Sequence, residues 1–194
     1  FLLIFFYTPS KAQDIGAIDT VRVSKVSTSA GSKVIVRVTL FNDEPLAAVL
    51  IPLKFSGNAL IPDSVSLAGT RIENASLKPI SIDTLNQRIV FGAVYFGAPL
   101  AAGDGVIGKL FFTVKGDAFP QAVPIDTFVS EVNYLSLVDA AAVEILPAFK
   151  AGEINITAVN LPAKFELLAN KTIAEGESLK IEVAKLTSQE PEEI

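Results

Sequence analysis

The chain has 194 residues, half of them hydrophobic, and carries 16 Lys and Arg against 21 Asp and Glu for a net charge of −5 at pH 7. It contains no Cys and no His, which excludes disulfides, thiolate metal sites and catalysis by the most common general base. A mildly acidic chain without a cluster of Lys and Arg also lacks the usual signature of nucleic-acid binding.

The first seven residues, FLLIFFY, are apolar but far too few to cross a bilayer. Ser10 and Ala12 follow as small residues at the −3 and −1 positions of a cleavage site. Residues 1–12 are therefore interpreted as the remnant of a secretory signal peptide. The mature protein is expected to be secreted or held at the cell surface, without membrane insertion. An amino-terminal core strand is the alternative.

The alternation of apolar and polar residues has the two-residue period of half-buried strands over much of the chain. It predicts strands at residues 20–27, 33–41, 48–56, 87–96, 105–115, 123–129, 134–138 and 152–157, with brief ones at 64–67 and 78–82. The fold class expected from this spacing is all-β, an antiparallel nine-stranded β-sandwich.

Three local departures from the pattern carry further predictions. The alternation slips before Val26, which indicates a bulge or a strand shared between two sheets. Pro52 cannot donate a ladder hydrogen bond, so it is expected at a bulge or an open strand edge. The stretch 139–145 has helical propensity, but Pro147 would stop a helix at once, and a turn at Asp139–Ala142 is favoured.

The stretch 105–115 is interpreted as the central strand, opened by a Gly-Asp-Gly turn at residues 103–105. Val106, Leu110, Phe112 and Val114 are expected to face the core. Phe111 interrupts the polar side of the same strand, so that side is expected to meet something apolar.

Composition changes at Pro162, after which charged residues are frequent. Two short strands, 165–168 and 179–183, can be read there, too few for an independent core. Residues 13–158 are therefore expected to fold alone. Residues 159–194 are expected to be a linker and the start of an incomplete domain.

Four segments together resemble the cohesin family of bacterial surface proteins. They are VRVSKVSTSAGSKVIVRVTL, VLIPLKFSG, RIVFGAV followed by GDGVIGKLFFTVKG, and the closing GEINI. The resemblance implies a jelly-roll sandwich that binds protein partners, typically a dockerin. Carbohydrate-binding modules of similar topology share much of this pattern.

The tail FELLANKTIAEGESLKIEVAK resembles the opening of an immunoglobulin-like or cadherin-like repeat. Some of those repeats have an acidic residue just after this strand, where this chain has Lys185 and Leu186. That departure leaves calcium binding by the repeat without its usual ligand.

No pattern in the chain predicts an enzyme or a cofactor. Without His or Cys, nucleophilic catalysis would need a Ser–Lys dyad or paired carboxylates. No SxxK motif lies on an expected helix, and pairs such as Asp43 and Glu44 lie in turns, where solvated charge is the ordinary explanation.

The function expected is therefore a secreted, non-catalytic binding or scaffold module, monomeric within a longer chain, with a dockerin-like partner. The alternative is a carbohydrate-binding module of a larger extracellular polysaccharide-degrading protein. That alternative is weakened because the chain has no Trp, and Tyr95 and Tyr134 are the only Tyr beyond the leader.

A partner-binding surface is predicted if strands 48–56, 87–96 and 105–115 share one sheet. Its outer face would then be an aromatic centre ringed by polar side chains, which is the composition of a protein interface. The residues predicted to form it are Phe111, Lys109, Thr113, Lys54, Arg88 and Tyr95. The competing interpretation covers Phe111 with the loop 99–104.

Overall fold

The computed structural model describes residues 16–158 and 175–176. The chain divides into two units, Phe1–Ala158 and Val159–Ile194. The expected signal-peptide remnant and the expected strands of the immunoglobulin-like segment lie outside the described residues. In the part that is described, no helix is long and apolar enough to cross a membrane.

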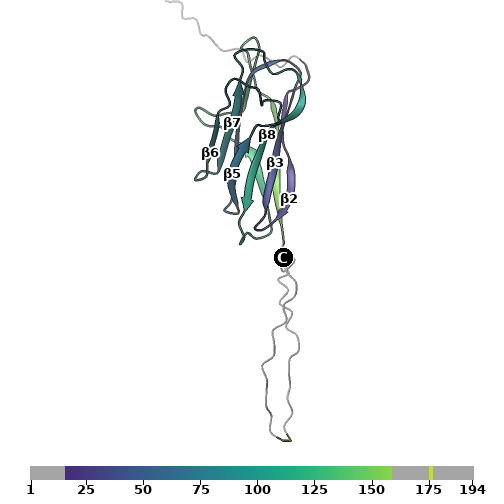
Figure 1. Cartoon of the computed structure of the whole chain (residues 1–194), viewed down its shortest axis with the longest axis vertical. Helices are drawn as coiled ribbons and strands as arrows, with labels where there is room; N and C mark the ends of the chain where they lie inside the picture. The colour runs from purple at the N-terminus through teal and green to yellow at the C-terminus, as the bar shows by residue number, and fades with distance from the viewer. Residues whose placement is uncertain (1–15, 159–174, 177–194) are drawn as a thin grey trace, which may run out of the picture. The chain divides into compact units, whose positions relative to one another are not determined.

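The described residues form thirteen strands in two sheets (Figure 1). The five-stranded sheet has, in spatial order, β12 (Ala148–Lys150), β1 (Thr20–Val23), β3 (Lys33–Asn42), β8 (Gly103–Val114) and β5 (Leu60–Ser66). The eight-stranded sheet has the path β11 (Glu144–Ile145), β10 (Ser136–Asp139), β4 (Leu46–Phe55), β9 (Gln121–Thr127), β13 (Gly152–Thr157) and β2 (Lys25–Ser29). Off that path, β7 (Arg88–Val94) pairs with β4 and with β6 (Ile80–Asp83).

The expected all-β sandwich is confirmed, with two refinements to its details. Most strand pairs are antiparallel, but β1 with β12 and β2 with β13 are parallel. The strands outnumber the nine expected partly because two extended stretches, 20–29 and 148–157, each divide between the two sheets.

The strand shared between sheets that the slip before Val26 suggested is confirmed. The chain leaves β1 at Val23, crosses at Ser24 and continues as β2 in the other sheet. Its parallel neighbour crosses at Ala151 between β12 and β13. Gly152 permits this double crossing, because a Cβ there would lie 2.6 Å from the Ser24 carbonyl oxygen.

The core lies between the sheets and is built from the inward-facing alternate residues of both. Phe112 of β8 and Phe55 of β4 meet edge to face across it, with ring centroids 5.3 Å apart. The prediction that Val106 faces the core is wrong. Ile107 is fully buried and Val106 is only partly so, because a register shift beside Val38 places an extra residue in β8 and reverses the phase.

The other two predictions about local departures are confirmed, but the turn expected at residues 103–105 is wrong. Pro52 lies on β4 between the residues that pair with β10 and those that pair with β9, so that edge is open there. The turn after Asp139 forms a hairpin in which the Asp139 carboxylate accepts the backbone N–H groups of Ala141 and Val143, both at 2.8 Å. The expected Gly-Asp-Gly turn is instead the beginning of β8.

Candidate functional site

Five of the six residues predicted to form one binding surface lie in strands of two different sheets, and the sixth, Tyr95, follows β7. The premise that the three strands share a sheet is wrong, because β8 belongs to the five-stranded sheet whereas β4 and β7 belong to the eight-stranded sheet. On one outer face lie Lys109, Phe111 and Thr113, and on the opposite outer face lie Lys54 and Arg88. Sequence alternation assigns a residue to one side of its own strand, but not to a sheet.

The β4–β7 face is the outer surface of the eight-stranded sheet formed by Ala48, Leu50, Pro52 and Lys54 of β4 and by Arg88, Val90, Gly92 and Val94 of β7. The alternate residues of β4, which are Val49, Ile51, Leu53 and Phe55, are buried in the core. The two sets therefore point in opposite directions, and the β4–β7 face is the side away from the other sheet.

A row of four charges crosses one end of the β4–β7 face. Lys54 and Arg88 are directly opposite each other, Arg88 is opposite Asp83 of β6, and Lys54 is opposite Asp126 of β9. Arg88 also stacks over the Phe128 ring, with its guanidinium carbon 4.6 Å from the centroid. The pKa of Asp83 is lowered chiefly by hydrogen bonds from Asn86, and Arg88 adds to the effect.

The rest of the β4–β7 face is apolar. Val90 and Val94 are half-buried; Val90 lies opposite Pro52, which is buried, and Val94 lies opposite the half-buried Ala48. Leu77 pairs with Val94 in an isolated bridge and is 51% exposed. The face therefore has an apolar surface bordered at one end by charge, which is the arrangement found in protein interfaces.

The β3–β8 face is the outer surface of the five-stranded sheet formed by Lys33, Ile35 and Arg37 of β3 and by Lys109, Phe111 and Thr113 of β8. Phe111 is half-buried and lies opposite Ile35 on one side and Ser64 on the other. The interpretation that loop 99–104 covers Phe111 is wrong. Gly103 precedes Phe111 by eight residues on β8 and pairs there with Asn42. At the rise of a strand, this separates Gly103 from Phe111 by roughly 25 Å.

Tyr95, the sixth predicted residue, follows β7 and packs against the core. Its hydroxyl oxygen is buried, and burial raises the pKa of this group while nearby Arg71 opposes the shift. Tyr95 therefore presents little of its ring to a partner or a sugar.

Tyr134, the other Tyr considered for sugar stacking, is 39% exposed, and the pKa of its hydroxyl is raised by a hydrogen bond with Glu144.

Arg71 binds the loop that precedes β8. Its guanidinium donates to the carbonyl oxygens of Leu40 and Gly103, both at 2.9 Å, and to that of Ala101 at 2.7 Å. A Cβ on Gly105 would lie 2.9 Å from the Arg71 Cδ. Gly103 and Gly105 thus leave room for the Arg71 side chain, which links its own segment to β3 and to the start of β8.

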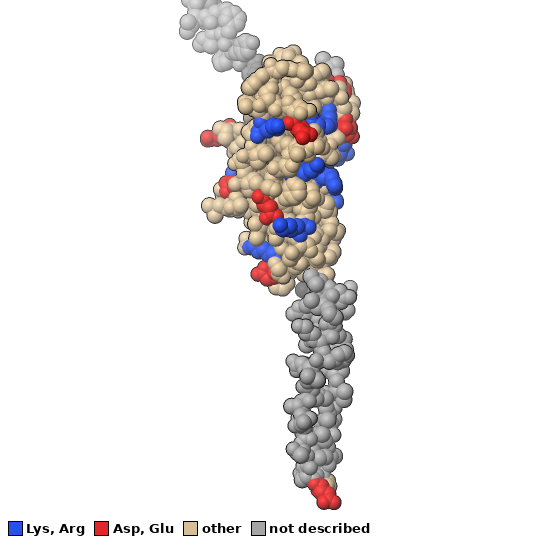
Figure 2. Space-filling view, in the orientation of Figure 1, with Lys and Arg blue, Asp and Glu red and all other residues tan. Residues whose placement is uncertain are grey.

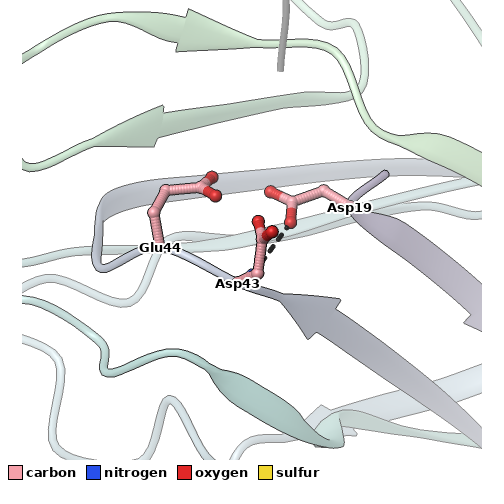
Figure 3. A group of neighbouring side chains, drawn as sticks. All are labelled: Asp19, Asp43 and Glu44. Atoms are coloured by element: carbon pink, nitrogen blue, oxygen red, sulfur yellow. Dashed lines mark hydrogen bonds between the residues drawn. The ribbon is translucent and has the colours of Figure 1, made fainter. Parts of the chain in front are cut away.

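A cluster of three carboxylates was missed by the sequence reasoning. Asp19, Asp43 and Glu44 point their carboxylates toward one another (Figure 3), with one oxygen of each within 4.8 Å of the others. Asp19 is fully buried, and its Oδ1 accepts the backbone N–H of Asp43 at 3.3 Å. Asp43 is exposed, as expected for solvated charge, but Glu44 is only partly exposed and lies against the buried Asp19. The signal lay in Asp19, 24 residues earlier in the chain, which only the fold brings near.

The three carboxylates of the cluster shift the pKa values of Asp43 and Glu44. Burial, the hydrogen bond with Asp43 and the charge of Asp19 raise the pKa of Glu44 to about 8. The hydrogen bond with Glu44, followed by that from the Ala17 N–H, lowers the pKa of Asp43. The hydrogen bonds of Asp19 and Asp43 tie the segment before β1 to the turn between β3 and β4.

The chain matches the family model of the cohesin domain over residues 20–156. A search of the curated proteins finds no match. Solved structures with the same fold include the third cohesin of ScaC from Acetivibrio cellulolyticus, in complex with the ScaB dockerin, at a TM-score of 0.65 and 23% identity over 73% of this chain and 100% of that one.

Two further structures extend the comparison. A cohesin of OlpC from Clostridium thermocellum, also in a dockerin complex, has a TM-score of 0.63 and 22% identity over 75% of this chain and 97% of that one. A non-cellulosomal cohesin from the archaeon Archaeoglobus fulgidus has a TM-score of 0.59 and 17% identity over 73% and 93% of the two chains. These likenesses establish the fold, and the family model covers well over half of the sequence. The chain therefore belongs to the cohesin family.

Proposed function

We propose that this chain is a secreted or cell-surface, non-catalytic binding module that holds a dockerin-like protein domain on its β4–β7 face. Family membership supports a binding role, and the cohesins of ScaC and OlpC were solved in complexes with dockerins. The apolar start and the small residues before Gln13 support export.

The observation that carries the choice of surface is the layout of the β4–β7 face. Val90 and Leu50 are half-buried on a regular pair of strands, with Leu77 exposed beside Val94. A partner that covers this surface removes apolar area from water, which is the main favourable term in association. The row of four charges lies at one end, whereas the row at the other end, through Ala48 and Val138, carries a single acid, Glu144. This unequal distribution of charge favours one orientation of the partner.

Two of the predicted contact residues, Lys54 and Arg88, keep their proposed role on this face. Each is exposed, and each is next to an acid in the same row. A partner's carboxylate that binds Lys54 or Arg88 replaces an acid already next to that cation, so these contacts contribute more to specificity and association rate than to affinity. The apolar residues beside them are expected to supply most of the affinity.

The test immobilises the full chain and captures proteins from the culture medium of the source organism, with identification by mass spectrometry. The expected result is capture of proteins that carry a dockerin segment. Val90→Asp should weaken that binding by at least about 30-fold, because it places a charge in the centre of the apolar surface. Phe119→Asp is the matched control, since Phe119 is 81% exposed in the loop between β8 and β9, away from this face.

Three results would count against the proposal. Captured proteins without a dockerin segment would remove the partner class. Dockerin capture that Val90→Asp leaves unchanged would keep the partner but move it to another surface. Retention on insoluble cellulose, chitin or xylan, displaced by soluble oligosaccharide, would favour the carbohydrate-binding alternative instead.

A further inference from the structure

We propose that the β3–β8 face is a second binding surface, on the opposite side of the molecule from the β4–β7 face, and that it takes an extended acidic segment of a protein. The segment would carry an apolar side chain two residues from a carboxylate. This inference is independent of the dockerin proposal, because it concerns the other sheet.

The two sheets differ in the sign of their charge. The strands of the five-stranded sheet carry five cations, Arg22, Lys33, Arg37, Lys109 and Lys150, against two acids, Asp63 and Asp104. The strands of the eight-stranded sheet carry three cations, Lys25, Lys54 and Arg88, against five acids, Asp83, Asp126, Asp139, Glu144 and Glu153. In a chain with a net charge of −5, a cationic sheet favours an anionic partner.

Both acids of the five-stranded sheet already have partners within the chain. Asp104 forms an ion pair with Arg22 at 3.1 Å, and Asp63 accepts the Thr113 hydroxyl at 2.8 Å. Figure 2, drawn in the orientation of Figure 1, shows the Lys and Arg side chains of this side in small groups with acidic side chains next to several of them, on a mostly uncharged surface.

The central feature of the β3–β8 face is a pair of cations in register. Arg37 and Lys109 are directly opposite each other, and the next residue in that row on β5 is Ser66. On its other side, the Arg37 carbonyl oxygen accepts the Ser24 N–H, and the Arg37 N–H donates to the Ser24 hydroxyl oxygen, both at 2.9 Å. Like charges directly opposite repel, and in this row no acid relieves the repulsion, in contrast to the row that contains Lys54 and Arg88. A carboxylate from a partner placed between Arg37 and Lys109 would relieve it.

Lys109 is already held in position, because its Nζ donates to the Ala68 carbonyl oxygen at 2.9 Å. An ordered side chain loses less entropy when a ligand binds. Its two remaining N–H groups are available to a carboxylate.

The next row along the same strands is apolar. Ile35 is 41% exposed and lies opposite Phe111, and Ile61 of β5 is 43% exposed one row further. Successive rows on one face are two residues apart, or about 7 Å. An extended peptide with side chains two residues apart has the same spacing, so a carboxylate over Arg37 and Lys109 places the next side chain on that face over Ile35 and Phe111. The row after that contains Lys33 and Thr113, so a second carboxylate of the peptide would lie next to Lys33, on the side away from Asp63, which accepts the Thr113 hydroxyl.

The test titrates the full chain with a fluorescent, blocked peptide in which Glu, Leu and Glu alternate with Ser, and measures anisotropy. The expected result is saturable binding that weakens when salt rises from about 0.05 M to about 0.5 M. Arg37→Ser and Phe111→Ser should each weaken binding at least about tenfold. Lys25→Ser, an exposed cation on β2 in the other sheet, should leave it unchanged. If Phe111→Ser does not fold, Ile35→Ser replaces it.

Equal loss with Lys25→Ser and Arg37→Ser would overturn the proposal, since it would indicate only non-specific attraction to a cationic molecule. So would equal binding of a peptide with Ser in place of Leu, or no binding at all. If the chain instead self-associates in sedimentation velocity, and Arg37→Ser abolishes that association, the occupant is a second copy and the proposal fails. Val90→Asp separates the two surfaces, because it should affect dockerin capture and leave peptide binding intact.

Discussion

Lys54 of β4 and Arg88 of β7 lie directly opposite each other on the outer face of the eight-stranded sheet, and each has an acid on its other side. Asp126 therefore offsets part of the repulsion between the two cations. We expect Asp126→Asn to lower the free energy of unfolding in urea by about 0.5–1 kcal/mol. Lys54→Gln should stay within about 0.5 kcal/mol of wild type, because it removes a repulsion and an attraction together. Equal effects of the two substitutions would contradict this account.

Arg71 and Arg22 form a matched pair for measuring what an arginine contributes to the fold. Arg71 donates to three backbone carbonyl oxygens, whereas Arg22 makes an ion pair with Asp104 in which both side chains are substantially exposed. Arg71→Ala is expected to cost about 2–3 kcal/mol in free energy of unfolding. Arg22→Ala should cost less than about 1 kcal/mol. Denaturant unfolding of both variants checks this, and a larger loss for Arg22→Ala would contradict it.

Glu44 should make stability decrease as the pH rises. Its pKa is about 8 in the folded protein against an ordinary value of 4.5, so between these values the folded state binds more protons than the unfolded state. The stabilisation is complete below pH 4.5 and is lost as the pH passes through 8. The contribution of Glu44 should therefore lower the melting temperature progressively from pH 4.5 to about pH 8 and add no further fall above that.

Glu44→Gln should remove most of that fall, because the amide remains neutral over the whole range. Glu131→Gln, at an exposed loop position, is the control and should retain it. The lowered pKa of Asp43 acts in the opposite sense, since its stabilisation is lost only as the pH falls into the acid range. A Glu44→Gln variant with the same pH dependence as wild type would show that the cluster does not hold a proton near neutral pH.

Phe111 and Phe112 are adjacent in sequence but face opposite sides of β8. Phe112 is fully buried against Phe55, so Phe112→Ala is expected to cost about 3–5 kcal/mol. Phe111 lies on the outer face, and Phe111→Asp should cost only about 1 kcal/mol. Thermal and urea unfolding distinguish the two. If Phe111→Asp loses several kcal/mol, Phe111 is a core residue and the β3–β8 face is not a surface.

A chain truncated after Ala158 should keep its cooperative unfolding transition. The core of the sandwich is drawn from residues 21–156. We therefore expect the urea midpoint of residues 13–158 to match that of the full chain. Loss of cooperativity on truncation would show that residues after Ala158 are needed for the fold.

The strands themselves follow from local sequence, because alternation with period two depends only on neighbouring residues. It located β3, β4, β7 and β8 closely, and its slip before Val26 located the crossing between sheets. Asp139 and the residues after it specify their hairpin locally, because the aspartate carboxylate accepts N–H groups two and four residues ahead. The cohesin resemblance rested on these same local patterns.

Only the tertiary structure decided which strands share a sheet. Strand pairing is non-local: β8 lies between β3 and β5, and nothing in its own residues distinguishes that sheet from the one containing β4 and β7. That choice separated Phe111 from Lys54 and Arg88. Gly108 illustrates the same limit, since a Cβ there would lie 2.7 Å from the ring of Phe91 in the opposite sheet. The contact with Phe91 therefore requires glycine at residue 108. The contact between Asp19 and Glu44 is of the same kind, because it too joins residues that only the folded chain makes neighbours.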